Sequence, residues 1–405
     1  MSILGLVENF NASYYRKLNL VASENITSAA VRYALQSDFG HRYGMPEKKD
    51  PAVWDYPDQD SIRAITRKAE NLACGLFHAV AADVNPLSGN QVAMIMLTSL
   101  LQEGDSFLSV PADCGGHFAT EKIAVERGYS RLDIPYRDGR LDVEQTANLV
   151  RQHQAKLIFL DASMVLFPYP LRELRVAVGD DVIISYDGSH TMGIIAGGQF
   201  QSPIEEGADF FHGSTHKSFW GPQKAIITSA HSPDEYAPAK AVFSRVMPLF
   251  VSNAHPHHIA ALGIALEESQ KFGREYADHV VKNARTLAHS LSNRGLKPLF
   301  EGQGFTQCHQ IIVPIGNRGQ AEEAFRRLEA ANINVNAIHT PFRDEYGLRI
   351  GLSELTRRGI VNGEMQATGE LIADAVLAQR AVEDIRRDVA ELSGSHQTIY
   401  YCNIG

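Results

Sequence analysis

The stretch DVIISYD, residues 181–187, is a short apolar run that ends in an aspartate. It is rich in isoleucine and valine and too short for a helix, so we expect a buried β-strand. Similar runs lie at 106–110 (SFLSV), 155–163 (AKLIFLDAS) and 224–230 (KAIITSA), with helix-like segments between them. This alternation predicts an α/β fold with a mostly parallel sheet that has helices on both faces.

The second half of the chain has a different pattern. Residues 274–296 carry an apolar stripe at helical spacing that stops at Gly295, which is typical of a long amphipathic helix. The apolar runs at 310–316 and 348–352 then indicate strands, and residues 363–392 indicate a closing helix. This order is typical of a small α+β unit at the C-terminal end.

The length of 405 residues fits one large domain together with a smaller one. We therefore expect an N-terminal arm over residues 1–45, a large cofactor-binding α/β domain over 46–280 and a small C-terminal α+β domain over 281–405. Hydrophobic residues make up 44% and charged residues 21% of the chain, which is typical of a globular protein with a sizeable core.

Composition and charge argue against several classes of function. The net charge is −9 and no basic block is present, so we expect no nucleic-acid partner. The absence of both a long apolar run and a basic, apolar leader predicts a cytoplasmic protein with no membrane partner. Because the four cysteines are far apart and form no C-x-x-C motif, we expect neither disulfides nor a metal site. They are Cys74, Cys114, Cys308 and Cys402.

An aspartate and a lysine near strand ends point to a cofactor. Asp187 closes the first strand described above, and Lys217 follows in the stretch FFHGSTHKSFWGPQKAI at 210–226. Carboxyl ends of parallel strands line the binding crevice, where an aspartate can hold a protonated ring nitrogen and a lysine can form a Schiff base. Pyridoxal 5'-phosphate needs both groups. A turn aspartate or a surface lysine is the ordinary alternative for each alone, but their combination with His190, His216 and glycine turns favours the cofactor.

Two further segments could hold the phosphate and the ring. Ser88, Gly89 and Asn90 precede an apolar helix, where free amides and the helix dipole favour an anion. Ser214 could add a hydroxyl. An ordinary helix cap is the alternative for this segment. His117 follows two glycines that permit close approach, and its imidazole could cover the ring face; a helix N-terminal histidine without a ligand is the alternative there.

Together these motifs resemble those of the serine hydroxymethyltransferase family, which are fold-type I pyridoxal-phosphate enzymes with an aspartate-aminotransferase-like fold. The resemblance runs from about residue 20 to residue 390 in consistent order. The segments that carry it are LVASEN (20–25), PLSGNQVA (86–93), GGH (115–117), DGSHTMGIIAGG (187–198), GSTHKSFWGPQ (213–223) and LRIGLSELTRRG (348–359).

The resemblance implies a role for each cofactor residue. Lys217 would form the Schiff base, Asp187 would pair with the pyridine nitrogen, and His190 would contact the cofactor near its phenolic oxygen. His117 would stack on the ring. The other cofactor-binding residues would be Ser88, Gly89, Asn90, Ser214 and His216, with the phosphate held by Ser88, Gly89 and Ser214.

The resemblance also implies substrates and a partner. The substrate would be an amino acid whose carboxylate binds Arg349 and Ser23, since a guanidinium is a natural clamp for a planar carboxylate. Its amine would displace Lys217 to form an external aldimine, after which a bond at Cα breaks. An aldehyde could be a second substrate. In this family the dimer completes each active site, which implies a homodimer with shared active sites.

One segment departs from the family pattern. Folate-dependent members carry Y-x-E-G-Y-P-G-x-R-Y-Y-G-G, but residues 37–65 here place His41 near the glutamate position and lack the tandem tyrosines. Four stretches more closely resemble a divergent branch that includes L-threonine transaldolases of natural-product pathways. They are residues 51–65, 113–119, 216–224 and 304–310. The tyrosine expected near residue 41 in that branch is also replaced by His41.

Several reactions remain open at this point. The favoured hypothesis is aldol-type cleavage of the Cα–Cβ bond of a β-hydroxy amino acid such as threonine, followed by addition to another aldehyde. The alternatives are Cα–H chemistry (racemisation, epimerisation or α-substitution), folate-dependent hydroxymethyl transfer between serine and glycine, or a non-catalytic pyridoxal- or dinucleotide-binding protein. The dinucleotide version is weakened because no G-x-G-x-x-G follows a strand.

His41 is a candidate for the group that selects the bond. An imidazole has an ordinary pKa near about 6.5, so it can exchange protons at neutral pH next to Cα or Cβ. The alternative is a loop histidine that only packs or lies near the phosphate.

Overall fold

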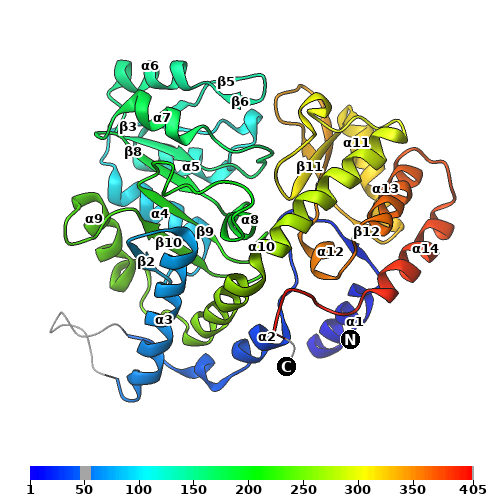
Figure 1. Ribbon diagram of the computed structural model, residues 1–405, viewed down its shortest axis with the longest axis horizontal. Helices are drawn as coiled ribbons and strands as arrows, with labels where there is room; N and C mark the ends of the chain where they lie inside the picture. The colour runs from blue at the N-terminus through cyan, green and yellow to red at the C-terminus, as the bar shows by residue number, and fades with distance from the viewer. Residues whose placement is uncertain (46–55, 404–405) are drawn as a thin grey trace. The chain divides into compact units, whose positions relative to one another are not determined.

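The structure is a computed structural model that describes residues 1–45 and 56–403 (Figure 1). It contains two compact units: Met1–Ile26 with Glu275–Cys402, here called the small unit, and Thr27–Arg274 with residue 403, here called the large unit. The predicted N-terminal segment 1–45 is therefore divided between the units at residue 26. The boundaries at 45 and 280 stay predictions for domains. In the described part of the chain, no helix is both long and apolar enough to cross a membrane.

The large unit is built on a seven-stranded sheet with the order β2-β10-β9-β8-β7-β3-β4. Neighbours from β4 through β9 pair in parallel, whereas β10 pairs antiparallel with both β9 and β2. The sheet is thus mostly parallel, and the predicted α/β fold is confirmed. The strands are β2 (Ala81–Asp83), β3 (Ser106–Ser109), β4 (Ser130–Asp133), β7 (Leu157–Leu160), β8 (Ile183–Asp187), β9 (Phe210–Ser214) and β10 (Ala225–Ser229).

Helices connect and cover these strands. Ser88 caps α4 and Asp142 caps α6, because each side chain accepts a hydrogen bond from an amide of the first turn. Helices α3 and α4 contact β10, α5 contacts β4 and α6 contacts β3. The helices are α2 (Ala29–Leu35), α3 (Gln59–Phe77), α4 (Gly89–Leu100), α5 (Phe118–Arg127), α6 (Val143–His153), α7 (Leu171–Val178), α8 (Met192–Ala196), α9 (Ala237–Arg245) and the first part of α10 (Pro256–Asn293), with short turns η1 (Asp38–His41), η2 (Ala112–Cys114) and η3 (Val246–Phe250) and the hairpin β5 (Tyr136–Arg137) and β6 (Arg140–Leu141). From Glu275 onward, the residues of α10 belong to the small unit.

The small unit contains a three-stranded antiparallel sheet with the order β11-β14-β13, and β1 pairs in parallel with β12. The predicted strands at 310–316 and 348–352 are found as β11 and β14. The elements are α1 (Ile3–Tyr14), β1 (Leu18–Asn19), η4 (Glu301–Gln303), β11 (Gln310–Gly316), α11 (Arg318–Ala330), β12 (Ile333–Asn334), β13 (Asn336–His339), β14 (Tyr346–Gly351), α12 (Ser353–Arg357), α13 (Gly363–Val376) and α14 (Val382–Ser395).

The single closing helix predicted over 363–392 is wrong. The structure has two helices there, α13 and α14, with a break between Val376 and Val382. Ala378 adopts a left-handed conformation with φ of 56°, which is incompatible with a continuous right-handed helix. The sequence has no glycine or proline at this position, so the local pattern did not predict the end of a helix there.

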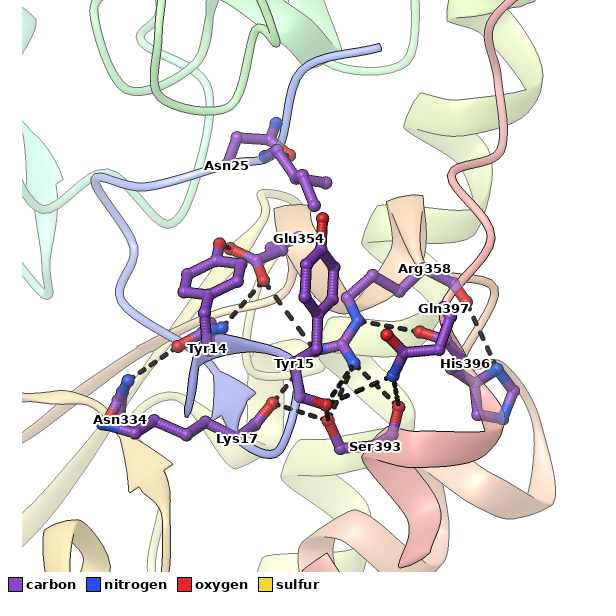
Figure 2. A network of polar contacts seen from close by, with 12 residues as sticks. Tyr14, Tyr15, Lys17, Asn25, Asn334, Glu354, Arg358, Ser393, His396 and Gln397 are labelled. Atoms are coloured by element: carbon purple, nitrogen blue, oxygen red, sulfur yellow. Dashed lines mark hydrogen bonds and ion pairs between the residues drawn. The ribbon is translucent and has the colours of Figure 1, made fainter. Parts of the chain in front are cut away.

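A buried arginine ties the N-terminal segment to the C-terminal helices of the small unit (Figure 2). The guanidinium of Arg358 donates hydrogen bonds to the carbonyls of Lys17 at 2.9 Å, Ser393 at 2.8 Å and His396 at 3.0 Å. The Ser393 hydroxyl in turn donates to the carbonyl of Tyr15 at 2.6 Å. The chain between α1 and β1 is thereby held by residues at the C-terminal ends of α12 and α14.

A buried carboxyl holds the same segment from another side (Figure 2). Glu354 is 2% exposed, and its two oxygens accept hydrogen bonds from the Tyr14 hydroxyl and, at 2.9 Å, from the Asn19 side-chain amide. Burial raises the pKa of Glu354 to about 7, against the opposing effects of Tyr14, Asn19 and Arg358. The Glu354 carboxyl therefore changes charge near neutral pH.

Candidate active site

One pocket of the large unit gathers most of the side chains that the sequence predicted for the cofactor. It lies where β7, β8 and β9 end and where α4 and α5 begin, as expected for the carboxyl edge of a parallel sheet. The residues that line it are Gly89, Asn90, Ala93, His117, Thr120, Asp161, Ala162, Ser163, Asp187, Ser189, His190, Ser214 and Lys217.

Lys217 reaches this pocket from the turn that follows β9. Its Nζ lies 3.4 Å from Nε2 of His190, so the amine and the imidazole can share a proton. The turn itself is held by Ser218, whose hydroxyl accepts a hydrogen bond from the amide of Gly193 at 3.0 Å. A Cβ at Gly193 would collide with the backbone of Ser218, so glycine permits this close packing.

Asp187 is the last residue of β8 and presents its carboxylate to the pocket. One oxygen accepts from the amide of Ser189 at 2.8 Å, and the other lies 3.9 Å from Nδ1 of His212. Burial lowers the pKa of His212 despite the nearby carboxylate, so this imidazole is neutral at neutral pH. The negative charge of Asp187 is thus left for a cationic ligand group, as a protonated ring nitrogen would be.

The start of α4 provides a cradle for an anion. Gly89 is the first residue of this helix, and a Cβ there would collide with the hydroxyl of Ser214. The amide of Ser214 is fixed by Ser189, whose hydroxyl accepts from it at 2.9 Å. Free amides at a helix start, together with a hydroxyl, suit a phosphate. Ser88 does not line the pocket; its hydroxyl caps the helix by accepting from Gln91 at 3.3 Å.

Two predicted histidines differ in their relation to the pocket. His117 lines it at the start of α5, and its amide donates to the carbonyl of Asp161 at 2.8 Å. Burial lowers the pKa of His117, so the ring is a neutral, flat surface at neutral pH. His216 is not among the lining residues. Burial and the neighbouring Lys217 lower its pKa to about 4.

Asp161 is the main lining residue that we did not predict. It directly follows β7, is 3% exposed, and accepts a hydrogen bond from the amide of Val110 at 3.3 Å. Burial raises its pKa well above the ordinary range, with Thr120 acting in the opposite direction. The signal was present, because Asp161 directly follows the apolar residues of the run 155–163, just as Asp187 follows those of 181–187. Thr120, Ser163 and Ser189 were also missed and carried no distinguishing motif.

The predicted substrate residues Arg349 and Ser23 both lie in the small unit. Arg349 is on β14 and donates to the Asn336 side chain at 2.9 Å; burial lowers its pKa to about 10, so it stays cationic at neutral pH. A Cβ at Gly351, two residues further along β14, would collide with Ala22, so the loop that carries Ser23 packs beside the arginine's strand. That these residues join Lys217 at one site stays a prediction.

His41 is not brought to the pocket of Lys217. It ends the short turn η1, is exposed, and does not line the pocket. Its neighbour in the large unit is His257, whose pKa is lowered first by burial and to a smaller extent by nearby groups that include His41. Part of the divergent segment, residues 46–55, lies outside the described residues.

Comparisons with known proteins identify the family. A model of the family described as serine hydroxymethyltransferase matches residues 2–372. The chain belongs to the serine hydroxymethyltransferase family. Among similar relatives are serine hydroxymethyltransferases of Methanopyrus kandleri, 38% identical over 99% of this chain and 94% of the relative, and of Methanosphaera stadtmanae, 36% identical over 95% and 91%.

A solved structure extends this comparison. The L-threonine transaldolase from Pseudomonas fluorescens, in its internal aldimine state, matches with a TM-score of 0.94 and 29% identity over 99% of this chain and 93% of that chain. The predicted fold-type I architecture and the predicted cofactor are therefore confirmed. The chain is a pyridoxal-phosphate-dependent transferase of the serine hydroxymethyltransferase family that acts on amino acids.

The residues of the pocket fit pyridoxal phosphate. A helix start and a hydroxyl at Gly89 and Ser214 suit the phosphate, the carboxylate of Asp187 suits a ring nitrogen, and Lys217 supplies an amine for covalent attachment. When bound, the cofactor supplies an electron-poor ring that takes up the electron pair of a bond broken at Cα.

Proposed function

We propose that this enzyme breaks and forms the Cα–Cβ bond of β-hydroxy amino acids by aldol-type chemistry, with threonine as the donor and an aldehyde as the acceptor. Serine hydroxymethyl transfer and threonine transaldol transfer, which the relatives' names state, both require that this bond breaks. The observation that favours the aldehyde over folate is the divergent segment around His41, which lacks the family's glutamate and tandem tyrosines.

The pocket residues have separate tasks in this proposal. Lys217 would hold the cofactor through its amine, and this amine can exchange a proton with Nε2 of His190 at 3.4 Å. Asp187 would hold the proton on the ring nitrogen. His117 would cover the ring, and the start of α4 at Gly89 would hold the phosphate.

Arg349 and Ser23 would orient the substrate. Arg349 keeps its charge at neutral pH, and Asn336 fixes its guanidinium by accepting two hydrogen bonds, at 2.9 and 3.3 Å. A guanidinium held in this way can bind a carboxylate with two parallel hydrogen bonds. The substrate's Cα would then keep one orientation toward the ring.

We further propose a homodimer with shared active sites. Helix α1 has no buried residue, and its apolar side chains Ile3, Leu4 and Phe10 are 82%, 67% and 63% exposed. Exposed apolar surface of this kind favours docking, and a second copy is the occupant that the proposal names. His41, which lies outside the pocket of its own chain, would then serve the pocket of the partner. Sedimentation or light scattering at micromolar concentration should give twice the chain mass.

Product analysis tests the proposed reaction. The purified holoenzyme is incubated with threonine, serine or glycine, each with and without an aromatic aldehyde, and each with and without tetrahydrofolate. We expect threonine plus aldehyde to give acetaldehyde and a new β-hydroxy amino acid without any folate. Lys217→Ala is the matched inactive control. A product that forms only with tetrahydrofolate would overturn the proposal.

Folate-dependent hydroxymethyl transfer is the second candidate, because relatives named serine hydroxymethyltransferase are 35–38% identical over nearly the whole chain. The same experiment separates the two reactions. Interconversion of serine and glycine that rises with tetrahydrofolate concentration, with no acetaldehyde from threonine, would support this candidate.

A further inference from the structure

Lys224 is a lysine with no exposed surface in the large unit. It directly precedes β10, and its whole side chain is buried, with 0% exposure. A buried ammonium is costly unless hydrogen bonds replace its hydration. It does not line the cofactor pocket, so its burial needs another explanation.

The amine of Lys224 joins two segments that are far apart in sequence. Its Nζ donates to the carbonyl of Asn85 at 3.0 Å and to the carbonyl of Ala254 at 2.9 Å. Asn85 begins the loop 85–88 that leads to the phosphate cradle at Gly89, and Ala254 lies in the segment 251–255 before α10. Lys224 therefore links the phosphate loop to this segment through backbone atoms.

Two neighbouring residues hold the same loop. The carboxylate of Asp83 accepts from the backbone and side-chain amides of Asn85 at 2.8 and 2.9 Å. The side chain of Gln91 accepts from the amide of Leu87 at 2.7 Å and donates to the carbonyl of Phe250 at 2.8 Å. Gln91 thus makes a second link between the phosphate loop and the chain before α10.

The two hydrogen bonds of Lys224 can form whether its amine is protonated or neutral. Burial lowers the pKa of Lys224 to about 7, and the nearby Asp83 opposes this effect. A neutral amine still carries two N–H donors, which is the number needed for the carbonyls of Asn85 and Ala254. The link is therefore made by hydrogen bonds on both sides of neutral pH.

We propose that Lys224 is a positioning residue that presets the phosphate loop, so that the amides at the start of α4 are already arranged for the phosphate of the cofactor. This rests on the proposed phosphate-binding role of Gly89. A loop fixed before binding loses less entropy when the ligand binds, and the benefit concerns the phosphate alone.

The test compares two ligands of full-length protein freed of cofactor: pyridoxal phosphate and pyridoxal, which lacks the phosphate. Binding is followed by absorbance and by quenching of tryptophan fluorescence. Lys224→Met keeps the length and removes the donors. We expect its affinity for pyridoxal phosphate to fall about tenfold or more, the loss of one buried hydrogen-bonded group. Its affinity for pyridoxal should change less than about twofold.

Matched variants separate positioning from general damage. Lys224→Arg keeps donors and should restore most of the affinity for pyridoxal phosphate, whereas Lys240→Met alters an exposed lysine of the same unit and should change neither ligand. If Lys224→Met does not fold, Gln91→Met cuts the second link and should give the same selective loss.

The outcomes separate the role of Lys224 from that of the phosphate site. Equal losses for both ligands, or no loss for either, would overturn the positioning role. If the unaltered protein binds pyridoxal as tightly as pyridoxal phosphate, the proposed phosphate site itself is wrong, and the role of Lys224 falls with it.

Discussion

Replacing Glu354 by glutamine should make the protein more stable at alkaline pH. In the small unit this carboxyl accepts hydrogen bonds from Tyr14 and Asn19 and is almost fully buried. A glutamine has the shape of a protonated glutamate. Its oxygen can accept from Asn19 and its amide can donate to the hydroxyl of Tyr14, so both contacts survive in Glu354→Gln without a buried charge.

The magnitude follows from the pKa of Glu354. Burial raises it from the ordinary 4.5 to about 7. Each tenfold change in proton affinity is worth about 1.4 kcal/mol, so the folded state favours the protonated form by about 3 kcal/mol. Because the folded-state pKa is the higher one, this stability is fully present below pH 4.5 and is lost as the pH rises to about 7.

The assay is urea unfolding of the holoenzyme between pH 5 and 8.5, with cofactor in excess. Other titrating groups affect both proteins equally, so only the difference in free energy of unfolding is interpreted. Between pH 5 and pH 8 we expect the free energy of unfolding of Glu354→Gln to rise by about 2 to 3 kcal/mol relative to that of the parent. The exposed Glu391→Gln on α14 is the control and should give a flat difference.

The opposite result would refute this reasoning. If Glu354→Gln is less stable than the parent at pH 8, the ionised carboxylate stabilises the folded state through Arg358, whose Nη1 lies 4.0 Å away, and burial does not raise its pKa as we infer. A difference that does not change with pH would show that the carboxyl does not titrate in this range.

Three further predictions concern the active site. Borohydride reduction and peptide mapping should place the cofactor on Lys217, and a label on Lys224 would contradict the pocket assignment. Asp187→Asn should keep the cofactor but lower kcat on the order of 100-fold, because a preorganised charge is lost; parental turnover in this variant would refute the role. His41→Asn should keep cofactor binding while product formation falls strongly, measured by the acetaldehyde released from threonine. Unchanged turnover would leave His41 with a packing role.

Strand ends were the part of the site that the sequence could predict. Asp187 follows a run of β-branched residues, and Lys217 follows the next strand, so the shared edge of a parallel sheet brings them together. Asp161 obeys the same rule, since it directly follows β7. The N-terminal glycine of α4 was predictable for a similar reason, since a serine cap and an apolar helix define where the free amides lie.

Contacts made by backbone atoms could not be predicted from sequence patterns. The partners of Lys224 are the backbone carbonyl groups of Asn85 and Ala254. Every residue has such a group, so the residue type does not indicate the contact. The left-handed Ala378 between α13 and α14 belongs to the same class, because an alanine in the sequence does not indicate a positive φ. His41 illustrates a different difficulty. Its place in the family's sequence pattern predicted a role in selecting the bond that breaks, but in the structure of a single chain it does not line the pocket.

The attachment of the first residues to the last helices affects how the chain can fold during its synthesis. Tyr15 and Ser393, which share a hydrogen bond, are separated by 378 positions, and Tyr14 and Glu354 by 340. At about 5–20 residues per second, a ribosome needs roughly 20–70 s to make the intervening chain. During this time the apolar helix α1 has emerged without its anchoring partners. The beginning of the protein is therefore among the last parts of the small unit to receive its native contacts.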